Sequence, residues 1–178
     1  MTTTNFSPVA TSLLVALGLS FSACSVRPNL TESTNPVAAT ASPSNPVTAD
    51  DHLPLAERLA REASSRPSSG PRVEAVAAAL TRSGAGLGPL RQVLGRTIGA
   101  RFCMAGQTAP GLGVSICEFR DAPDAARGLA MSRQTFDRLI PNRRLERNRG
   151  TVLTLTRPSV NPDLDAEAAR LAHLFASL

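Results

Sequence analysis

The chain has 178 residues, enough for one domain of ordinary size with a tail, and its formal net charge is +5. The whole excess lies towards the C-terminus, because residues 24–84 hold six arginines against six acidic residues whereas residues 85–178 hold thirteen against eight. Such an excess favours contact with anionic lipid headgroups or cell-wall polymers. Aromatic residues make up only 3% of the chain, so the stacking residues of single-strand binders are scarce and we expect no nucleic-acid partner.

An apolar segment lies close to the N-terminus, over residues 13–19. A membrane-spanning helix needs roughly 20 apolar residues, and this run is shorter because Ser20 and Ser22 interrupt it. A short apolar core followed by small residues is typical of a secretory signal peptide. The sequence therefore predicts a signal peptide over residues 1–23.

The signal ends in Phe21-Ser22-Ala23-Cys24. This segment resembles the lipobox of bacterial lipoproteins, in which small residues precede a cysteine whose sulfur receives a diacylglyceryl group. The resemblance covers the first 24 residues only, and it implies a stable membrane anchor on Cys24, because two or three acyl chains bind a bilayer firmly. Ser25 after the cysteine implies, by the same resemblance, a place in the cell envelope at the outer membrane, facing the periplasm. The alternative is ordinary cleavage after Ser22, which leaves Cys24 as an unmodified thiol.

The next segments are poor in large apolar residues. Residues 24–50 are rich in Ser, Thr, Asn and Pro, and they predict a lipidated N-terminus followed by a disordered linker, because such a stretch buries too little surface to offset its ordering entropy. Residues 51–70 predict a short weak helix over 53–64 and a second linker. The domain proper is expected over residues 71–178.

Three helices are expected in this domain. One starts at Pro71 and ends at Gly84, a second is capped by Asp121 and extends to about Leu139, and a third follows Asn161-Pro162. The second is expected to bury alanines, Leu129 and the aromatic and aliphatic residues near its end. The third carries one apolar stripe: Leu164, Ala168, Leu171, Phe175 and Leu178.

Strands are expected between these helices. Residues 90–98 are ambiguous, and Gly95 together with the following Gly99 favours a strand over a helix. Residues 101–119 predict a hairpin that turns near Pro110, and residues 143–156 predict another, with the positive φ at Gly150. The order indicates an α+β fold, an antiparallel sheet of about four or five strands with about three helices packed on one face.

Cys103 and Cys117 are the remaining cysteines if Cys24 is acylated, and they fall on facing arms of the first hairpin. In an oxidising compartment an even pair predicts a structural disulfide. The alternative, a redox-active pair, lacks the CxxC spacing such sites use.

No segment carries a recognisable catalytic, cofactor or metal motif. The histidines His52 and His173 have no cysteine or carboxylate at ligand spacing. Ser115 lies in Gly-Val-Ser-Ile-Cys, which is not the GxSxG elbow of serine hydrolases, and residues 84–88 are best interpreted as a glycine-rich linker. We therefore expect a non-enzymatic protein without a cofactor.

The densest basic cluster is a candidate anion-binding site: Arg143, Arg144, Arg147 and Arg149. Two of its members share a strand face and present guanidinium forks suited to phosphate or carboxylate. The alternative is a solvated hairpin with Leu145 in the core. The sequence thus predicts a membrane-anchored envelope lipoprotein with a small binding or accessory domain, whose partners are the membrane and either an anionic envelope surface or a protein. Two alternatives stay open, a structural subunit of an envelope complex and an envelope enzyme with a dispersed site such as Ser115, Glu118 and Asp137.

Overall fold

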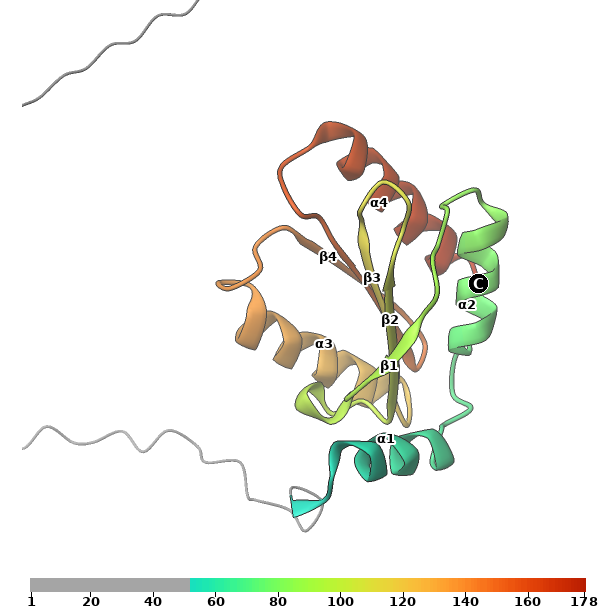
Figure 1. The fold of residues 1–178 in the computed structure, drawn as a ribbon, viewed down its shortest axis with the longest axis vertical. Helices are drawn as coiled ribbons and strands as arrows, with labels where there is room; N and C mark the ends of the chain where they lie inside the picture. The colour runs from blue at the N-terminus through green and yellow to red at the C-terminus, as the bar shows by residue number, and fades with distance from the viewer. Residues whose placement is uncertain (1–51) are drawn as a thin grey trace, which may run out of the picture. The chain divides into compact units, whose positions relative to one another are not determined.

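The computed structural model describes residues 52–178. The predicted signal peptide, the predicted lipidation site Cys24 and the predicted linker to residue 50 lie outside the described residues. The elements in chain order are α1 (Leu55–Ser64), α2 (Val73–Arg82), β1 (Arg91–Val93), the 3₁₀ helix η2 (Arg96–Ile98), β2 (Phe102–Gln107), β3 (Gly113–Glu118), α3 (Ala122–Phe136), β4 (Arg143–Asn148), β5 (Thr151–Thr156) and α4 (Pro162–Ala176) (Figure 1).

The strands form one antiparallel sheet in the order β1-β2-β3-β5-β4. The predicted α+β class is therefore confirmed. The β2–β3 and β4–β5 pairs are the two predicted hairpins, and β3 pairs with β5 so that the second hairpin joins the first. Within the described chain, no helix is long and apolar enough to cross a bilayer.

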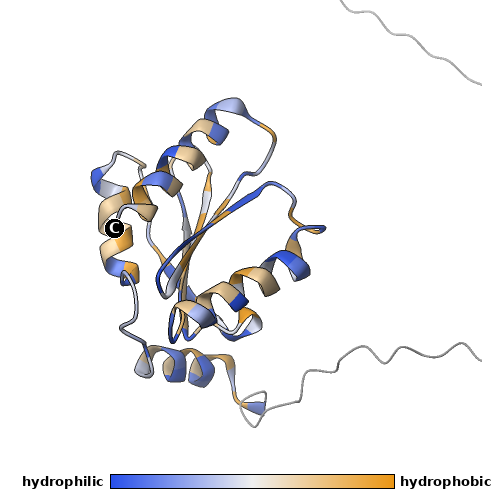
Figure 2. Cartoon of the chain, turned by 180° about the vertical axis from the view of Figure 1, so that it is seen from behind, coloured by the Kyte–Doolittle hydropathy of each residue, from blue (hydrophilic) through white to orange (hydrophobic). Residues whose placement is uncertain are grey.

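Helices α2 and α4 cover one face of the sheet. Their apolar stripes pack on large side chains that project from the three central strands, as the alternation of a strand requires. Figure 2 shows apolar and polar residues alternating along these helices, which is expected when one side of a helix is buried. The largest fully buried members of this core are Leu80, Leu112, Ile116, Leu153, Leu155, Leu171 and Phe175.

Helix α3 lies on the opposite face (Figure 1). The sequence predicted all helices on one face, and the structure differs in this respect. The physical reason is that β3 and the residue after it carry apolar side chains in both directions: Ile116 points towards α2 and α4, whereas Cys117 and Phe119 point towards α3. Both faces therefore need cover.

The buried stripe of α3 consists of small residues, Ala125, Gly128 and Ser132. A Cβ atom at Gly128 would overlap the ring of Phe119 and approach the carbonyl oxygen of Ile98. The helix therefore packs closer to the sheet than its predicted alanine and leucine stripe would allow. At its start, the predicted cap is confirmed, because the Asp121 carboxylate accepts the backbone N–H of Asp124 at 2.7 Å.

The segment predicted as one strand over 90–98 is divided. Only Arg91–Val93 pairs with β2, and η2 comes next, ending at Gly99 with a φ of 75°. The division has a local cause. The Glu62 carboxylate of α1 accepts the backbone N–H groups of Gly95 and Arg96, which are then turned away from the sheet.

The turn of the β4–β5 hairpin also differs in detail. Arg149, with a φ of 52°, adopts the left-handed conformation that was expected at Gly150. Gly150 instead packs against Ser69, whose hydroxyl oxygen a Cβ atom at position 150 would overlap. Glycine is needed there for close approach rather than for positive φ.

The segment before Pro71 is tied to the domain by hydrogen bonds. Gln92 donates to the carbonyl oxygen of Leu59 at 2.7 Å, and the Ser69 hydroxyl donates to the carbonyl oxygen of Phe119 at 2.8 Å. The Gly150 N–H donates to the Ser69 carbonyl oxygen at 3.3 Å. The folded unit therefore includes α1 and extends upstream of the boundary that the sequence predicted.

Candidate functional site

The disulfide lies on the α3 face of the sheet. Cys103 and Cys117 stand directly opposite each other on β2 and β3, and their sulfur atoms are bonded as predicted. Both residues are buried beneath α3, where they pack with Phe119, Ala125 and Val152. The bond therefore cross-links the two strands that form the centre of this face.

Helix α3 covers only part of the face, and a cleft of about 280 Å³ lies beside it. The floor is the disulfide together with side chains of β3 and β5. One wall comes from the end of β1 and from η2, and the other from the C-terminal part of α3 and the start of β4. The lining residues are Val93, Leu94, Thr97, Ile98, Cys103, Ser115, Cys117, Ser132, Phe136, Ile140, Arg143, Thr154 and Thr156.

Among the described residues that line the cleft, Arg143 is the one that carries a charge, and its side chain is only 5% exposed. Its Nη atoms donate to the hydroxyl and carbonyl oxygens of Ser132 at 3.1 and 3.0 Å and to Asp137 at 2.6 Å. The guanidinium also lies over the ring of Phe136, 5.5 Å from its centroid. Its Nε atom is buried and has no hydrogen-bond partner within residues 52–178.

The cleft combines two kinds of surface. Val93 and Ile140, which line the cleft, are 38% and 40% exposed. These exposed fractions are large for apolar residues. The lining also includes residues with hydroxyl groups from both the sheet and α3: Ser115, Ser132 and Thr154. Mostly apolar walls with a few polar groups are typical of small-molecule sites. The arrangement suits a ligand with a hydrocarbon part and a hydrogen-bonding head.

The four arginines of the predicted anion cluster do not converge. Arg143 and Arg147 share the α3 face of β4, as expected, but Arg144 projects to the other face. Arg143 is held by Ser132 and an acidic partner, and Arg149 donates to the carbonyl oxygen of Leu178 at 3.1 Å. Only the exposed Arg144 and Arg147 stand as a solvated hairpin surface.

The dispersed residues named for an alternative catalytic site are also apart. Ser115 lies on the cleft floor, with its Oγ atom 3.8 Å from the sulfur of Cys117. Glu118 projects from the opposite face of β3, and Asp137 pairs with Arg143. Among the described residues, no group of three or more His, Cys, Asp or Glu side chains is placed to hold a metal ion.

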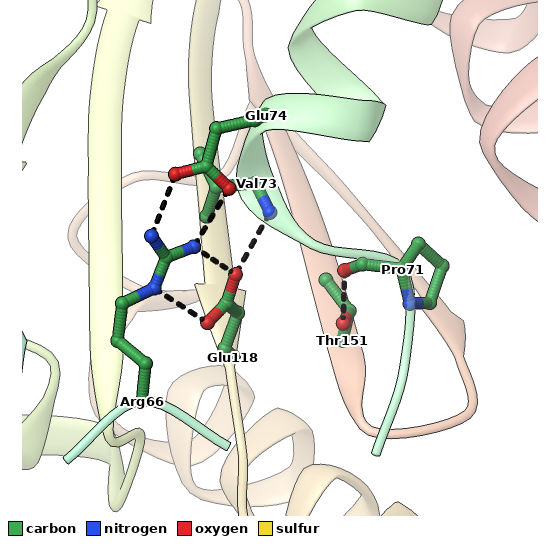
Figure 3. A network of polar contacts seen from close by, with 6 residues as sticks. All are labelled: Arg66, Pro71, Val73, Glu74, Glu118 and Thr151. Carbon is green, nitrogen blue, oxygen red and sulfur yellow. Dashed lines mark hydrogen bonds and ion pairs between the residues drawn. The ribbon is translucent and has the colours of Figure 1, made fainter. Parts of the chain in front are cut away.

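A buried polar network lies at the N-terminus of α2, on the other face of the sheet (Figure 3). Glu118 is 3% exposed and accepts two bonds from Arg66, at 3.1 and 2.5 Å, and one from the N–H of Val73 at 2.8 Å. Arg66 also reaches Glu74 at 2.6 and 2.8 Å. Nearby, the Thr151 hydroxyl donates to the Pro71 carbonyl oxygen at 2.8 Å.

These contacts fix the charges of the network. The hydrogen bonds to Glu74 and Glu118 raise the pKa of Arg66 above its ordinary value, and the bond from Arg66 lowers the pKa of Glu74. The guanidinium lies 4.1 Å from the centroid of the Phe102 ring. All three guanidinium nitrogens of Arg66 donate to Glu74 or Glu118. We therefore interpret the network as a clamp that holds residues 66–74 on the sheet.

Sequence reasoning missed both the clamp and the walls of the cleft. The signal for the clamp was Glu118, an acid at the end of an otherwise apolar strand.

Comparison with protein-family models, curated proteins and solved structures finds no match to this chain.

Proposed function

We propose that the chain is a bacterial envelope lipoprotein, anchored through lipid on Cys24, whose folded domain binds a small molecule in the cleft beside α3. The observation that carries the binding role is the cleft itself: an open hollow with exposed apolar walls, a hydroxyl-rich floor and one buried guanidinium. The role is that of a binding or accessory module rather than of a catalyst.

Two features support a place outside the cytoplasm. The N-terminal sequence ends in a lipobox-like segment at Cys24. The disulfide between Cys103 and Cys117 is of the kind that persists in oxidising compartments. An anchored module in the periplasm is the simplest protein that has both.

The anchor is tested by metabolic labelling with a palmitate analogue. The wild-type chain is expected to take up the label and to sediment with membranes, and Cys24→Ser is expected to lose both properties. Label that persists in Cys24→Ser, or a wild-type chain that is never labelled, contradicts the anchor. Neither result depends on what the cleft binds.

The cleft is tested with a dansylated fatty acid as probe, titrated into the purified full chain. The chain has no Trp or Tyr, so its own fluorescence does not obscure the probe. Ser115→Phe fills the floor and is expected to weaken binding at least tenfold, by roughly 1.4 kcal/mol. The exposed Ser159 provides the matched control, and Ser159→Phe is expected to bind as the wild type does.

Thr154→Phe fills the same floor from β5 and serves as a second variant. Thermal unfolding of each variant shows whether the domain is still folded. Equal probe affinity in all folded variants, or no binding by the wild type, removes the cleft as the site.

A further inference from the structure

A second hollow, of about 220 Å³, lies between α1 and the η2 segment. Among residues 52–178, its lining includes four arginines from three parts of the chain and one acidic residue, which comes from α1. The lining residues are Arg58, Arg61, Glu62, Ser65, Arg96, Ala100 and Arg101. None of them belongs to the cleft beside α3.

Glu62 joins the two segments between which this hollow lies. Its carboxylate accepts the N–H of Gly95 at 3.0 and 3.1 Å and the N–H of Arg96 at 3.2 Å, which fastens α1 to η2. Arg58 lies four residues before Glu62 on the same face of α1, and Ser65 directly follows the end of the helix; both line the hollow. Both oxygens of the Glu62 carboxylate are already engaged by backbone donors.

Two of these arginines have guanidinium N–H groups without an acceptor among the described residues. Within residues 52–178, the side chains of Arg58 and Arg101 have no hydrogen-bonded or ion-paired partner, and the Nε atom of Arg58 is buried. A buried guanidinium N–H without an acceptor is costly, and an anion in the hollow would supply one. The hairpin arginines differ, because Arg143 and Arg149 already donate to protein acceptors.

We propose that this hollow binds a phosphate group, held chiefly by Arg58 and Arg101. The planar fork of a guanidinium matches phosphate oxygens in bidentate geometry. The group belongs either to a lipid headgroup or to a soluble phosphorylated molecule, since the chemistry of recognition is the same. The site uses other residues than the cleft and stands independently of the function proposed for it.

The test uses the full chain carrying Cys24→Ser, so that acyl chains cannot account for membrane binding. Inorganic phosphate is titrated by calorimetry, and phosphatidylglycerol vesicles are titrated in a flotation assay. Arg58→Ala/Arg101→Ala is compared with Arg144→Ala/Arg147→Ala, which removes the same charge from an exposed strand. Arg58→Lys/Arg101→Lys keeps the charge and loses the fork.

Arg58→Ala/Arg101→Ala is expected to weaken binding at least about tenfold, because each charge-assisted hydrogen bond contributes substantially. The hairpin variant is expected to bind as the wild type does, and the lysine variant to lie between the two. Binding of phosphate alone indicates a soluble ligand, and binding of vesicles alone indicates a headgroup. Either result supports the site.

Equal losses in the two alanine variants would show a general charge effect and overturn the proposal. Absence of binding to both probes in the parent chain overturns it as well. Thermal unfolding of each variant shows whether the domain is still folded; α1 has no buried residue and Arg101 is exposed, so all variants are expected to fold.

Discussion

The two faces of the sheet are built differently. The face under α2 and α4 is sealed by large side chains, among them Ile116, Leu153 and Phe175, none of which is accessible to solvent. The face under α3 has a helix that packs through small residues and a cross-strand disulfide, and it leaves a cleft open.

The sequence of strand β5 accounts for this difference between the two faces of the sheet. Leu153 and Leu155 point to the sealed face and are fully buried, whereas Thr154 and Thr156 point to the cleft and are partly exposed. A strand that was to be covered on both faces would be a continuous apolar run. One face is thus specified as a closed core, and the other leaves a cleft.

Arg66→Ala should have the largest effect, because it leaves the buried Glu118 carboxylate without its cation. Breaking a buried pair in this way costs about 4 kcal/mol. The measurement is urea unfolding of the full chain. Arg72→Ala, an exposed arginine six residues away, is the control and should change stability by less than about 0.5 kcal/mol. Equal stability of the two variants would mean that the sealed face does not depend on the clamp.

Leu153→Ala and Thr154→Ala compare the two faces directly on neighbouring residues. The first removes a fully buried side chain and should cost about 3.5 kcal/mol. The second removes a methyl and a hydroxyl from the cleft floor and should cost less than about 1 kcal/mol. Chemical denaturation measures both. Similar losses would contradict a sealed face and an open one.

Reduction of the disulfide should lower the free energy of unfolding by about 3 kcal/mol in the chain-entropy model, because the bond closes a loop with a sequence separation of 14. Unfolding with and without reductant measures this change, and Cys103→Ala/Cys117→Ala checks it without reagent. The core under α2 and α4, as far as residues 52–178 form it, contains no cysteine, so the reduced chain should remain folded. An unfolding midpoint that is the same with and without reductant would contradict the prediction.

Glu74→Gln should have the smallest effect, and only above acidic pH. The bond from Arg66 lowers the folded-state pKa of Glu74 below its ordinary value of 4.5, so its contribution is present above that pH and is lost as the pH falls through the folded-state pKa. Glu74 itself is largely exposed, and the expected loss is about 0.5 kcal/mol.

Urea unfolding at about pH 6 and at about pH 3 measures how the contribution of Glu74 to stability depends on pH. The variant should be less stable than the wild type at the higher pH, and the difference should shrink at the lower. A difference that does not change with pH would contradict the pKa shift.

Much of the fold follows from local sequence patterns. Asp121 and Asn161 cap the helices they were expected to cap, and Cys103 faces Cys117 across a hairpin. Each of these predictions depends on residues close together in the chain or on a simple alternation. The side of the sheet on which α3 packs does not, because it depends on Gly128 fitting against Phe119.

The site was harder to predict than the fold. The arginine cluster was chosen by density in the sequence, and density does not reveal that Arg143 and Arg149 already have partners. The hollow at α1 unites Arg58 with Arg101, which are far apart in the sequence. Its formation depends on the Glu62 carboxylate, which joins the short helix predicted over residues 53–64 to the backbone of Gly95.

The clamp also constrains the order in which the molecule assembles. Arg66 is 52 residues from Glu118, and Pro71 is 80 residues from Thr151, whose hydroxyl donates to its carbonyl oxygen. These contacts close long loops, so the early segment has to wait for partners that are synthesised much later. We therefore expect the first part of the domain to be made to be among the last to become fixed, because its contacts close the longest loops.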